Sequence, residues 1–423
     1  MSEWREFMLA DVCRRVTDGD WIETKDQGGF DYRLLQVSNI GLGCFRETGK
    51  FRYVTGETFR RLRCTEISPG MVLVARMPDP VGRAWYVKEL DHPAITAVDV
   101  AIVDPDPEQL DGRFAAYLLN SPTQLAEWAA AAGGTTRMRI TRRQLADVRL
   151  SLPSLAVQKQ ISSVLGRFDD LIENNRRRVE VLEEIARTIY REWFVRFRYP
   201  GHENVPLVDS ALGPIPEGWS IGSLGDLAAL DRVNIQPRDS PGELFDHYSI
   251  PAFDDGARPV VEPGGAIKSG KYLLSTAAVL VSKLNPRIDR VWFAEPGTEQ
   301  RSVTSTEFLI LRPNERSHLE HLYLLARDPK FREQLTALSG GTSGSHQRAK
   351  PADFLKLPVA VAPAAVLDIL AKATSDQLRL ARQLARQGNK LAGLRDLLLP
   401  KLVTGQIDVS HLDLNALTEA ATA

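Results

Sequence analysis

The stretch that decides the fold reads PSLAVQKQISSVLGRFDDLIENNRRRVEVLEEIARTIYREWFVRF, residues 153–197. Ten positions in it are separated by alternating steps of four and three residues, and nine of the ten are apolar. They are Ile161, Leu165, Phe168, Ile172, Asn175, Val179, Leu182, Ala186, Ile189 and Trp193. This 3.5-residue repeat predicts a helix with one narrow apolar seam that packs against a second helix. Asn175, the one polar member, is expected to fix the register of that pairing.

The length of this predicted helix suggests a role as a spacer or scaffold. Roughly forty helical residues span about 60 Å, which is longer than an ordinary globular helix, so the segment has the dimensions of a spacer or scaffold. The alternative is a long core helix inside one large domain. The second half of the chain distinguishes these two interpretations.

Composition sets the class of protein. A chain of 423 residues is long enough for two to three domains, and its three cysteines have no paired spacing, which favours a reducing cytoplasm. No apolar run approaches the ~20 residues of a membrane helix, and the first residues lack the layout of a signal peptide. The formal net charge of −1 gives no global support for nucleic-acid binding, so any such site depends on local patches.

The chain repeats itself after a proline- and glycine-rich linker at residues 198–218. Before the linker, residues 1–152 contain short β-type runs at 34–40, 71–75 and 98–103 and a helical run at 114–132. Several features recur in order: Trp4, Leu9 and Asp11 as Trp219, Leu224 and Asp226, Val72-Leu73-Val74 as Val279-Leu280-Val281, Trp85 as Trp292, Pro122 as Pro329, and Gly133-Gly134-Thr135 as Gly340-Gly341-Thr342. Ordered matches of this kind indicate an internal duplication.

A second helical stretch at residues 364–402 is the natural partner of the first. Its expected seam carries Leu367, Leu370, Leu378, Ala381, Leu384, Leu391, Leu394 and Leu398, while Gly388 and Gly393 weaken it. We therefore expect an α+β fold with two tandem β-rich domains, joined by two long helices that form an antiparallel coiled coil with pseudo-twofold symmetry. The expected boundaries are a first domain at 1–152, a first long helix at 153–198, a linker and second domain at 199–362, a second long helix at 363–405, and a tail at 406–423.

The sequence contains no convincing catalytic or metal-binding motif. The sequence has no GxGxxG and no GxxxxGK[ST] phosphate loop. Residues 285–288 read Asn-Pro-Arg-Ile, which lacks the second proline and the aromatic residue of the Asn-Pro-Pro-aromatic motif of amino-methyltransferases. His318 and His321 have a spacing that suits a metal, but without a third ligand a solvated helix face is favoured. We therefore expect no catalytic residue and no metal in this chain.

Two donor-rich loops suit DNA. The first is GGTTRMRITRR at 133–143 and the second GGTSGSHQRAK at 340–350, at the same place in each repeat. Arginine pairs with guanine edges, glutamine with adenine, and hydroxyl groups with either, whereas phosphates accept from any donor. The alternative is an ordinary polar surface loop. The predicted DNA-contacting residues are Ser38, Asn39, Arg76, Arg83, Thr135, Thr136, Arg137 and Arg139 in the first repeat and Lys283, Asn285, Arg287, Ser343, Ser345, His346, Gln347 and Arg348 in the second.

The chain resembles the specificity subunits of type I restriction–modification systems. The most specific stretches are residues 152–194, GPIPEGW at 213–219, GTSGSHQR at 341–348 and LRDLLLPKLVTGQI at 394–407. The resemblance implies two target-recognition domains that each read half of a split sequence in double-stranded DNA, and a coiled coil that sets their spacing. It also implies docking of two methyltransferase subunits and, through them, restriction subunits. Catalysis, S-adenosylmethionine, ATP and Mg²⁺ then belong to those partners, in a bacterial, cytoplasmic, nucleoid-associated complex.

One departure from the family pattern concerns the second helix. The first helix follows SLPSLAVQKQI, close to the usual proline-leucine-glutamine start, whereas the second begins VAPAAVLDIL and lacks the glutamine. Two other classes of function stand beside the specificity subunit: a coiled-coil adaptor whose globular ends bind proteins, and a standalone DNA-modifying enzyme, which the missing cofactor motifs disfavour.

Overall fold

The computed structural model describes residues 4–133, 138–315, 317–340 and 348–409. Contacts within it divide the chain into two compact units. Unit 1 comprises residues 1–173 together with 390–423, and unit 2 comprises residues 174–389. Unit 1 is therefore discontinuous in sequence, whereas unit 2 is one uninterrupted segment.

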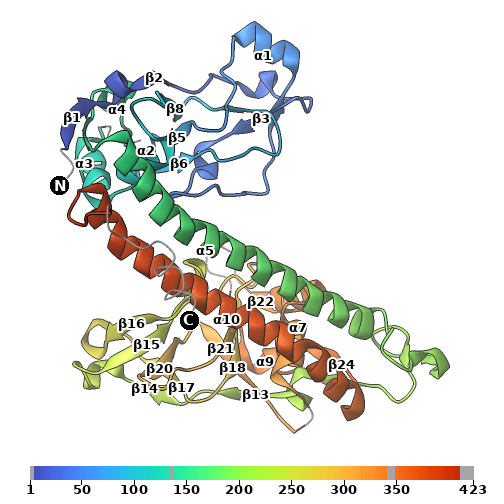
Figure 1. Cartoon of the computed structure of the whole chain (residues 1–423). Coiled ribbons are helices and arrows are strands. Elements are labelled where there is room, and N and C mark those ends of the chain that lie inside the picture. The colour runs from blue at the N-terminus through green and yellow to red at the C-terminus, as the bar shows by residue number, and fades with distance from the viewer. Residues whose placement is uncertain (1–3, 134–137, 316, 341–347, 410–423) are drawn as a thin grey trace. The chain divides into compact units, whose positions relative to one another are not determined.

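Unit 1 is built on a four-stranded antiparallel sheet in the order β2-β8-β5-β6 and a three-stranded sheet in the order β4-β3-β7 (Figure 1). The strands are β1 (Arg5–Met8), β2 (Cys13–Thr17), β3 (Tyr32–Leu35), β4 (Tyr53–Val54), β5 (Val72–Ala75), β6 (Ala84–Tyr86), β7 (Ala94–Thr96), β8 (Val100–Pro105) and β9 (Arg149–Leu152). The helices are η1 (Leu9–Val12), η2 (Thr24–Asp26), η3 (Val37–Asn39), α1 (Gly56–Leu62), α2 (Gly112–Leu119), α3 (Pro122–Ala131) and α4 (Arg142–Ala146). Strand β5 is apolar and wholly buried, as a central strand requires.

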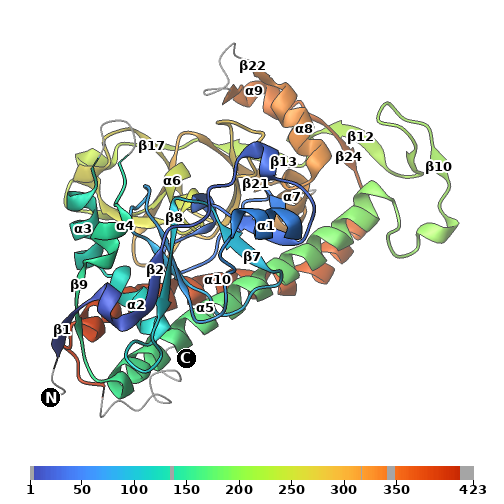
Figure 2. The ribbon, with the colours of Figure 1, turned by 90° about the horizontal axis from the view of Figure 1, so that it is seen from above.

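Unit 2 contains a four-stranded sheet in the order β13-β21-β18-β19 and a five-stranded sheet in the order β14-β17-β20-β15-β16. Its strands are β10 (Leu207–Val208), β11 (Ile215–Pro216), β12 (Ser220–Ser223), β13 (Ala228–Asp231), β14 (Asn234–Ile235), β15 (Leu244–Tyr248), β16 (Val260–Pro263), β17 (Lys271–Leu274), β18 (Ala278–Ser282), β19 (Val291–Ala294), β20 (Arg301–Ser305), β21 (Phe308–Pro313), β22 (Ser339–Gly340), β23 (Arg348–Ala349) and β24 (Pro358–Val361). Its shorter helices are η5 (His202–Asn204), η6 (Leu224–Asp226), η7 (Pro237–Asp239), η8 (Gly264–Ala266), α6 (Ile250–Asp254), α7 (Leu319–Ala326), α8 (Pro329–Ala337) and α9 (Pro351–Phe354). Figure 2 shows β12 beside β24, with β10 beyond them.

The two units share one topology, which confirms the predicted duplication. The order β2-β8-β5-β6 in unit 1 matches β13-β21-β18-β19 in unit 2, and every neighbouring pair in both is antiparallel. The second sheets also agree, because β3 pairs in parallel with β7 as β15 pairs in parallel with β20. Unit 2 extends this sheet with β17 and β14, which have no counterpart in the unit 1 sheet.

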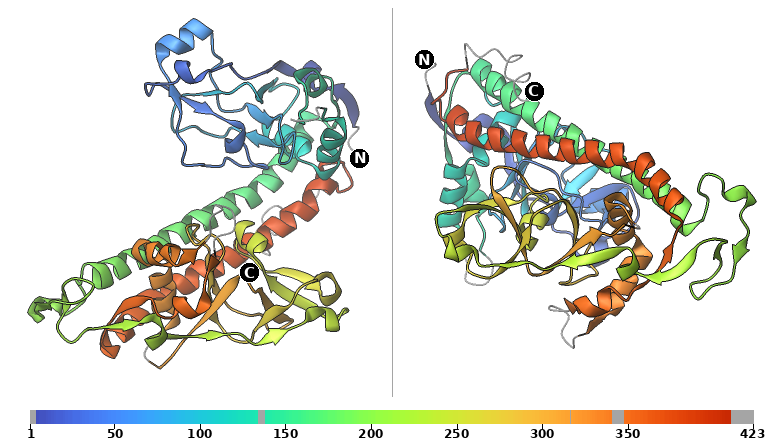
Figure 3. Two further views of the ribbon diagram at one scale, coloured as in Figure 1. Left: turned by 180° about the vertical axis from the view of Figure 1, so that it is seen from behind. Right: turned by 90° about the horizontal axis from the view of Figure 1, so that it is seen from below.

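The two long helices are α5 (Leu155–Tyr190), which runs on into the π-helical turn η4 (Arg191–Val195), and α10 (Ala364–Val403). In unit 1 the early seam residues Leu165 and Phe168 of α5 share a core with Leu391 and Leu402, near the end of α10. In unit 2 the order is reversed, since Ala186 shares a core with residues from the start of α10. The helices are therefore antiparallel, as predicted, and lie side by side in Figure 3. No helix in the part of the chain that the structure describes is both long and apolar enough for a membrane span.

The predicted seam residues of α5 are buried or half-buried, whereas one predicted seam residue of α10 is exposed. Every seam position of α5 is buried or half-buried, and Asn175 donates from Nδ2 to Gln387 Oε1 at 3.2 Å. Leu394 was predicted in the α10 seam, but its side chain is 37% exposed. Arg395 takes that position because the four-and-three stepping runs from 391 to 395, and its Nη1 lies 3.0 Å from Asp169 Oδ1.

The seam predicts a selective loss of stability. Leu165 is fully buried, so Leu165→Ala should lower the free energy of unfolding by ~2–5 kcal/mol through lost burial and a cavity. Val181, on the same helix, is 59% exposed, and Val181→Ala should change it by less than about 0.5 kcal/mol. Thermal and urea unfolding of both variants measure the difference, and equal shifts would contradict seam packing.

Candidate nucleic-acid interface

Arg83 ties two elements of unit 1 together at the turn that joins β5 to β6, residues 76–83. It is only 4% exposed. Its guanidinium donates to four backbone carbonyls, from Nε to Ile40 at 2.5 Å, from Nη1 to Met77 at 2.8 Å and Pro80 at 2.9 Å, and from Nη2 to Val37 at 2.8 Å. The turn is thereby fastened to η3, which carries the exposed Ser38. Burial, with Arg46 nearby, lowers the pKa of Arg83 below its ordinary value.

Arg76 holds the base of the first polar loop. Its Nη2 lies 3.2 Å from Asp18 Oδ1 and 3.6 Å from Asp99 Oδ1, and its carbonyl accepts from the Ile140 amide at 3.1 Å. The exposed Arg139 reaches the same Asp99 carboxylate at 3.5 Å. The loop's base is therefore fixed against the end of β5, next to the turn at 76–83.

Three residues predicted to contact DNA have structural roles instead. Arg76 and Arg83 are each 4% exposed and Asn39 is 3% exposed, so their donors face the protein interior. Asn39 Oδ1 accepts from the Gln36 amide at 2.9 Å, and Asn39 Nδ2 donates to the Arg46 carbonyl at 3.0 Å. The sequence identified residues of this region but could not show that the long arginine side chains turn inward.

Unit 2 repeats this construction with different chemistry. Arg290, the counterpart of Arg83, forms a bidentate pair with Asp254 of α6, with both N–O distances 2.7 Å. The carbonyl of Lys283 accepts from the Ala349 amide at 3.1 Å, as that of Arg76 does from Ile140. Arg348 then pairs with Glu307, with Nη2 2.9 Å from Oε1. Arg348 and Glu307 occupy the places of Arg139 and Asp99, so an arginine–acid pair lies at the base of the loop in both units.

The turn at residues 283–290 carries the candidate DNA-contacting side chains of the second repeat that precede its loop. Arg287 is exposed, Lys283 is half-buried, and Asn285 adopts a left-handed backbone with φ of 49°. Asp289 anchors the turn, since its Oδ2 lies 2.8 Å from Arg332 Nη2 and 3.4 Å from Arg327 Nη2.

The Asp289 anchor continues to the long helix α5. Arg327 Nη1 lies 2.6 Å from Glu183 Oε2, and Tyr323 donates to Glu183 Oε1 at 3.0 Å. Burial alone lowers the pKa of Arg327, but Tyr323, Glu183 and Asp289 together raise it above its ordinary value, so the guanidinium stays charged. The second turn is thus joined to α5 through one charged network.

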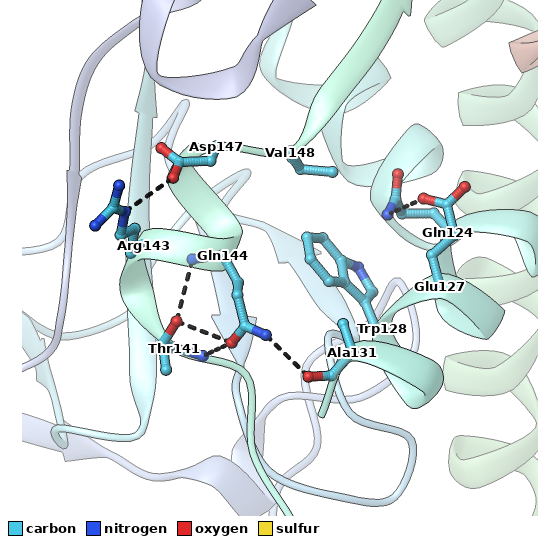
Figure 4. A pocket seen from close by; sticks show the side chains of 9 residues that line it. All are labelled: Gln124, Glu127, Trp128, Ala131, Thr141, Arg143, Gln144, Asp147 and Val148. Carbon is cyan, nitrogen blue, oxygen red and sulfur yellow. Dashed lines mark hydrogen bonds and ion pairs between the residues drawn. The ribbon is translucent and has the colours of Figure 1, made fainter. Parts of the chain in front are cut away.

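A small pocket beside the first loop shows how the loop's two ends are joined (Figure 4). Gln144 Oε1 accepts from the amide and the hydroxyl of Thr141, both at 2.8 Å, and Gln144 Nε2 donates to the Ala131 carbonyl at 2.9 Å. The end of α3 is thereby tied to the start of α4. The pocket has a volume of about 400 Å³, and the buried Trp128 lines it.

Arg46 is a candidate contact that the sequence did not reveal. It is exposed beside η3, where its amide donates to the Asn39 carbonyl at 2.8 Å. No motif marks it, because its position depends on the path of the chain after η3. Of the predicted contacts, Ser38, Arg139, Lys283, Asn285, Arg287 and Arg348 flank the two turns and loops. Thr135, Thr136, Arg137, Ser343, Ser345, His346 and Gln347 lie outside the described residues.

The pair His318 and His321 is not a solvated helix face. His321 is 2% exposed and lies against Phe194, with ring centroids 5.0 Å apart, so that expectation was wrong for it. Its Nδ1 lies 3.1 Å from Ser317 Oγ, while His318 Nε2 lies 2.8 Å from Asp368 Oδ1. Burial, with a smaller contribution from His318, lowers the pKa of His321 to about 3. The described residues contain no group of three side chains that could hold a metal ion.

Comparisons with known proteins agree on one family. Residues 1–184 match the family model described as the type I restriction modification DNA specificity domain. The HindI specificity subunit of Haemophilus influenzae is 20% identical over 474 residues, covering 96% of this chain and all of that one. The resemblance to type I specificity subunits is confirmed. Both of these similarities are to specificity subunits.

Two further similarities extend the comparison. The MjaIX specificity subunit of Methanocaldococcus jannaschii is 25% identical over 221 residues, which are 52% of this chain and 47% of that protein. The chain thus matches about half the length of this relative. The crystal structure of the type I restriction–modification S subunit from M. genitalium has a TM-score of 0.59 at 14% identity, covering 95% of this chain and 96% of that one, which shows a shared fold.

The contact between the first turn and α3 can be tested with two glycines. A Cβ at Gly82 would lie 2.2 Å from Trp128 Cδ1, whereas a Cβ at Gly70 would meet nothing within 4 Å. Both glycines have positive φ, 82° and 96°, so both alanine variants carry backbone strain. Gly82→Ala should therefore be less stable than Gly70→Ala by ~1–3 kcal/mol, the usual cost of overpacking. Thermal unfolding of both variants measures this difference, and equal melting temperatures would contradict the contact.

The buried His321 predicts a dependence of stability on pH. Its folded pKa of about 3 lies below the unfolded value of about 6.5, so below pH ~6.5 the unfolded chain binds a proton that the folded chain does not. Stability should fall by up to ~1.4 kcal/mol per pH unit from this residue as the pH drops from ~6.5 toward 3. Urea unfolding should show a shallower pH slope for His321→Gln than for the control His92→Gln, and identical slopes would refute this role.

Proposed function

We propose that this chain is the DNA-binding specificity subunit of a type I restriction–modification complex. In this proposal each β-rich unit reads one half of a bipartite target in double-stranded DNA. The helices α5 and α10 set the spacing of the half-sites. The chain also serves as a scaffold for two methyltransferase subunits and, through them, for restriction subunits.

One observation carries this proposal. The two units hold an equivalent turn and loop with equivalent devices, namely an arginine at the end of the turn and an arginine–acid pair at the loop base. The side chains that the turns present are nevertheless different: Met77 to Pro80 in one and Lys283 to Ile288 in the other. A constant frame with variable exposed groups is what reading two different half-sequences requires, because base edges are distinguished by the donors and acceptors set against them.

The domain limits follow from this proposal. Residues 1–152 and 199–362 are proposed as the target-recognition domains, 153–198 and 363–405 as the spacer helices, and 406–423 as a tail. The near-neutral net charge fits a chain whose partners supply part of the phosphate contacts, because affinity for DNA is largely electrostatic. Methyl transfer, cleavage and their cofactors are assigned to the partner subunits, and the chain itself is proposed to be non-catalytic.

Binding by the purified complex tests the proposal. Sequencing of methylated bases in the host, with and without this gene, first identifies the target. A gel-shift series should then show loss of binding when the spacer between the half-sites changes by one base pair, since the helix pair fixes the distance. Binding that ignores both spacer and sequence would sink the proposal and favour the protein-binding adaptor.

Substitutions in single turns test the assignment of half-sites. Arg287→Ala should weaken binding by ~1–3 kcal/mol, the usual value of a bidentate base contact, and should relax selectivity at one half-site only. Ser38→Ala, in the other unit, should affect the other half-site. Competition with duplexes altered in one half-site measures this, and equal effects on both half-sites would mean general phosphate contacts instead.

A further inference from the structure

One face of the small sheet in unit 1 carries a group of aromatic rings, which we call the aromatic face. Arg33 of β3 is paired with Tyr53 of β4, so their side chains lie on the same side of the sheet. Phe30 lies 4.3 Å from Tyr53 and 5.1 Å from His92 between ring centroids. The guanidinium of Arg33 lies 5.0 Å from the centre of the Phe51 ring. The aromatic face thus comprises Phe30, Arg33, Phe51, Tyr53 and His92.

The side of the sheet that carries the aromatic face is exposed only in part, because Leu35 and Ala94, on the same side as Arg33, are each 1% exposed. On the other side, α1 covers the strands, and Tyr32 stacks on Phe59 with ring centroids 4.2 Å apart. On the aromatic face, Phe30 is 64% exposed and Phe51 is 55% exposed. Exposed aromatic rings gathered at one place usually mark a binding surface.

The segment at residues 46–52, beside the aromatic face, carries three cations and one acid. Arg46, Lys50 and Arg52 are exposed, and no ion pair joins them to an acid in the described part of the chain. The acid in the same segment, Glu47, is already held by Arg33, with Nη2 to Oε2 at 2.7 Å, while the exposed Asp31 and Asp91 adjoin Phe30 and His92 in the sequence. The cations therefore remain available for an anionic partner.

The aromatic face is continuous with the candidate interface. Arg46 and Asn39 exchange backbone and side-chain hydrogen bonds, at 2.8 Å and 3.0 Å, so the segment that carries Arg46, Lys50 and Arg52 starts beside η3 and Ser38. The same segment then runs to β3, where the Leu34 amide donates to the Arg52 carbonyl at 2.8 Å. A duplex bound at Ser38 and Arg46 could therefore also contact Lys50 and Arg52 on the same segment.

We propose that the aromatic face, with Lys50 and Arg52, binds the duplex that flanks the first half-site. This inference rests on the proposed function and extends its DNA contact beyond the base pairs that are read. The two cations contact phosphates, and the rings of Phe30 and Phe51 pack against sugars on the strand between them. The contact adds affinity without sequence selectivity, because phosphates and sugars are alike at every base pair.

Salt dependence gives the sharpest test. Lys50→Gln with Arg52→Gln, in the assembled complex, should lower the slope of log affinity against log salt by about 2, since each phosphate contact contributes about 0.9. The loss should appear on a target duplex extended by a full helical turn beyond the first half-site and vanish on one that ends at that half-site. The matched control is Arg14→Gln with Lys159→Gln, which removes the same charge from exposed positions elsewhere in unit 1.

Each other outcome has a defined meaning. An unchanged slope for the Lys50 and Arg52 variant, or an equal change in the control, overturns the inference. The proposed function still stands in that case if the wild-type complex binds its target specifically. A wild-type complex without target preference defeats the proposed function itself. Phe30→Ala with Phe51→Ala should weaken binding to the extended duplex at constant slope. If that variant instead loses the methyltransferase subunit without DNA present, the aromatic face is a protein interface and the inference is wrong.

Discussion

Burial of one narrow apolar seam is the constraint on which the rest of the chain depends. Most helical stability in proteins comes from packing of an apolar face, and the largest core of each unit contains residues of both α5 and α10. The antiparallel pairing follows, because Leu165 meets residues near the end of α10 and Ala186 meets residues near its start. The polar positions Asn175 and Arg395 sit within this seam, and both are satisfied, the first by Gln387 and the second by Asp169.

The second constraint concerns how the turns at residues 76–83 and 283–290, whose exposed side chains differ between the units, are fixed in position. Arg83 and Arg290 do the same work with different acceptors, backbone carbonyls in one unit and the Asp254 carboxylate in the other. An arginine suits this role because its planar group presents five donors in a fixed geometry. Since the holding residues point inward, the exposed residues of the turns can change without loss of the frame.

The sequence predicted the features that repeat and missed those that depend on tertiary direction. The seam of α5 and the duplication are periodic, so spacing alone revealed them. The inward turn of Arg76 and Arg83 has no periodic signal, and a long basic side chain beside a polar loop resembles a DNA contact. His321 and Arg395 are polar residues that lie in apolar surroundings. His321 does so because its lowered pKa keeps it neutral, and Arg395 because it pairs with Asp169. Arg46 became visible only when the path after η3 was known.

The discontinuity of unit 1 has a consequence for biosynthesis. Residues 174–389 form unit 2 as one uninterrupted segment, so its core is complete before the last residues of the chain are made. The core of unit 1 contains both Leu9 and Val403, which lie near opposite ends of the chain. As the polypeptide emerges from the ribosome, the first unit begun is therefore the last to be finished, and until then Ile161 and Leu165 lack their α10 partners.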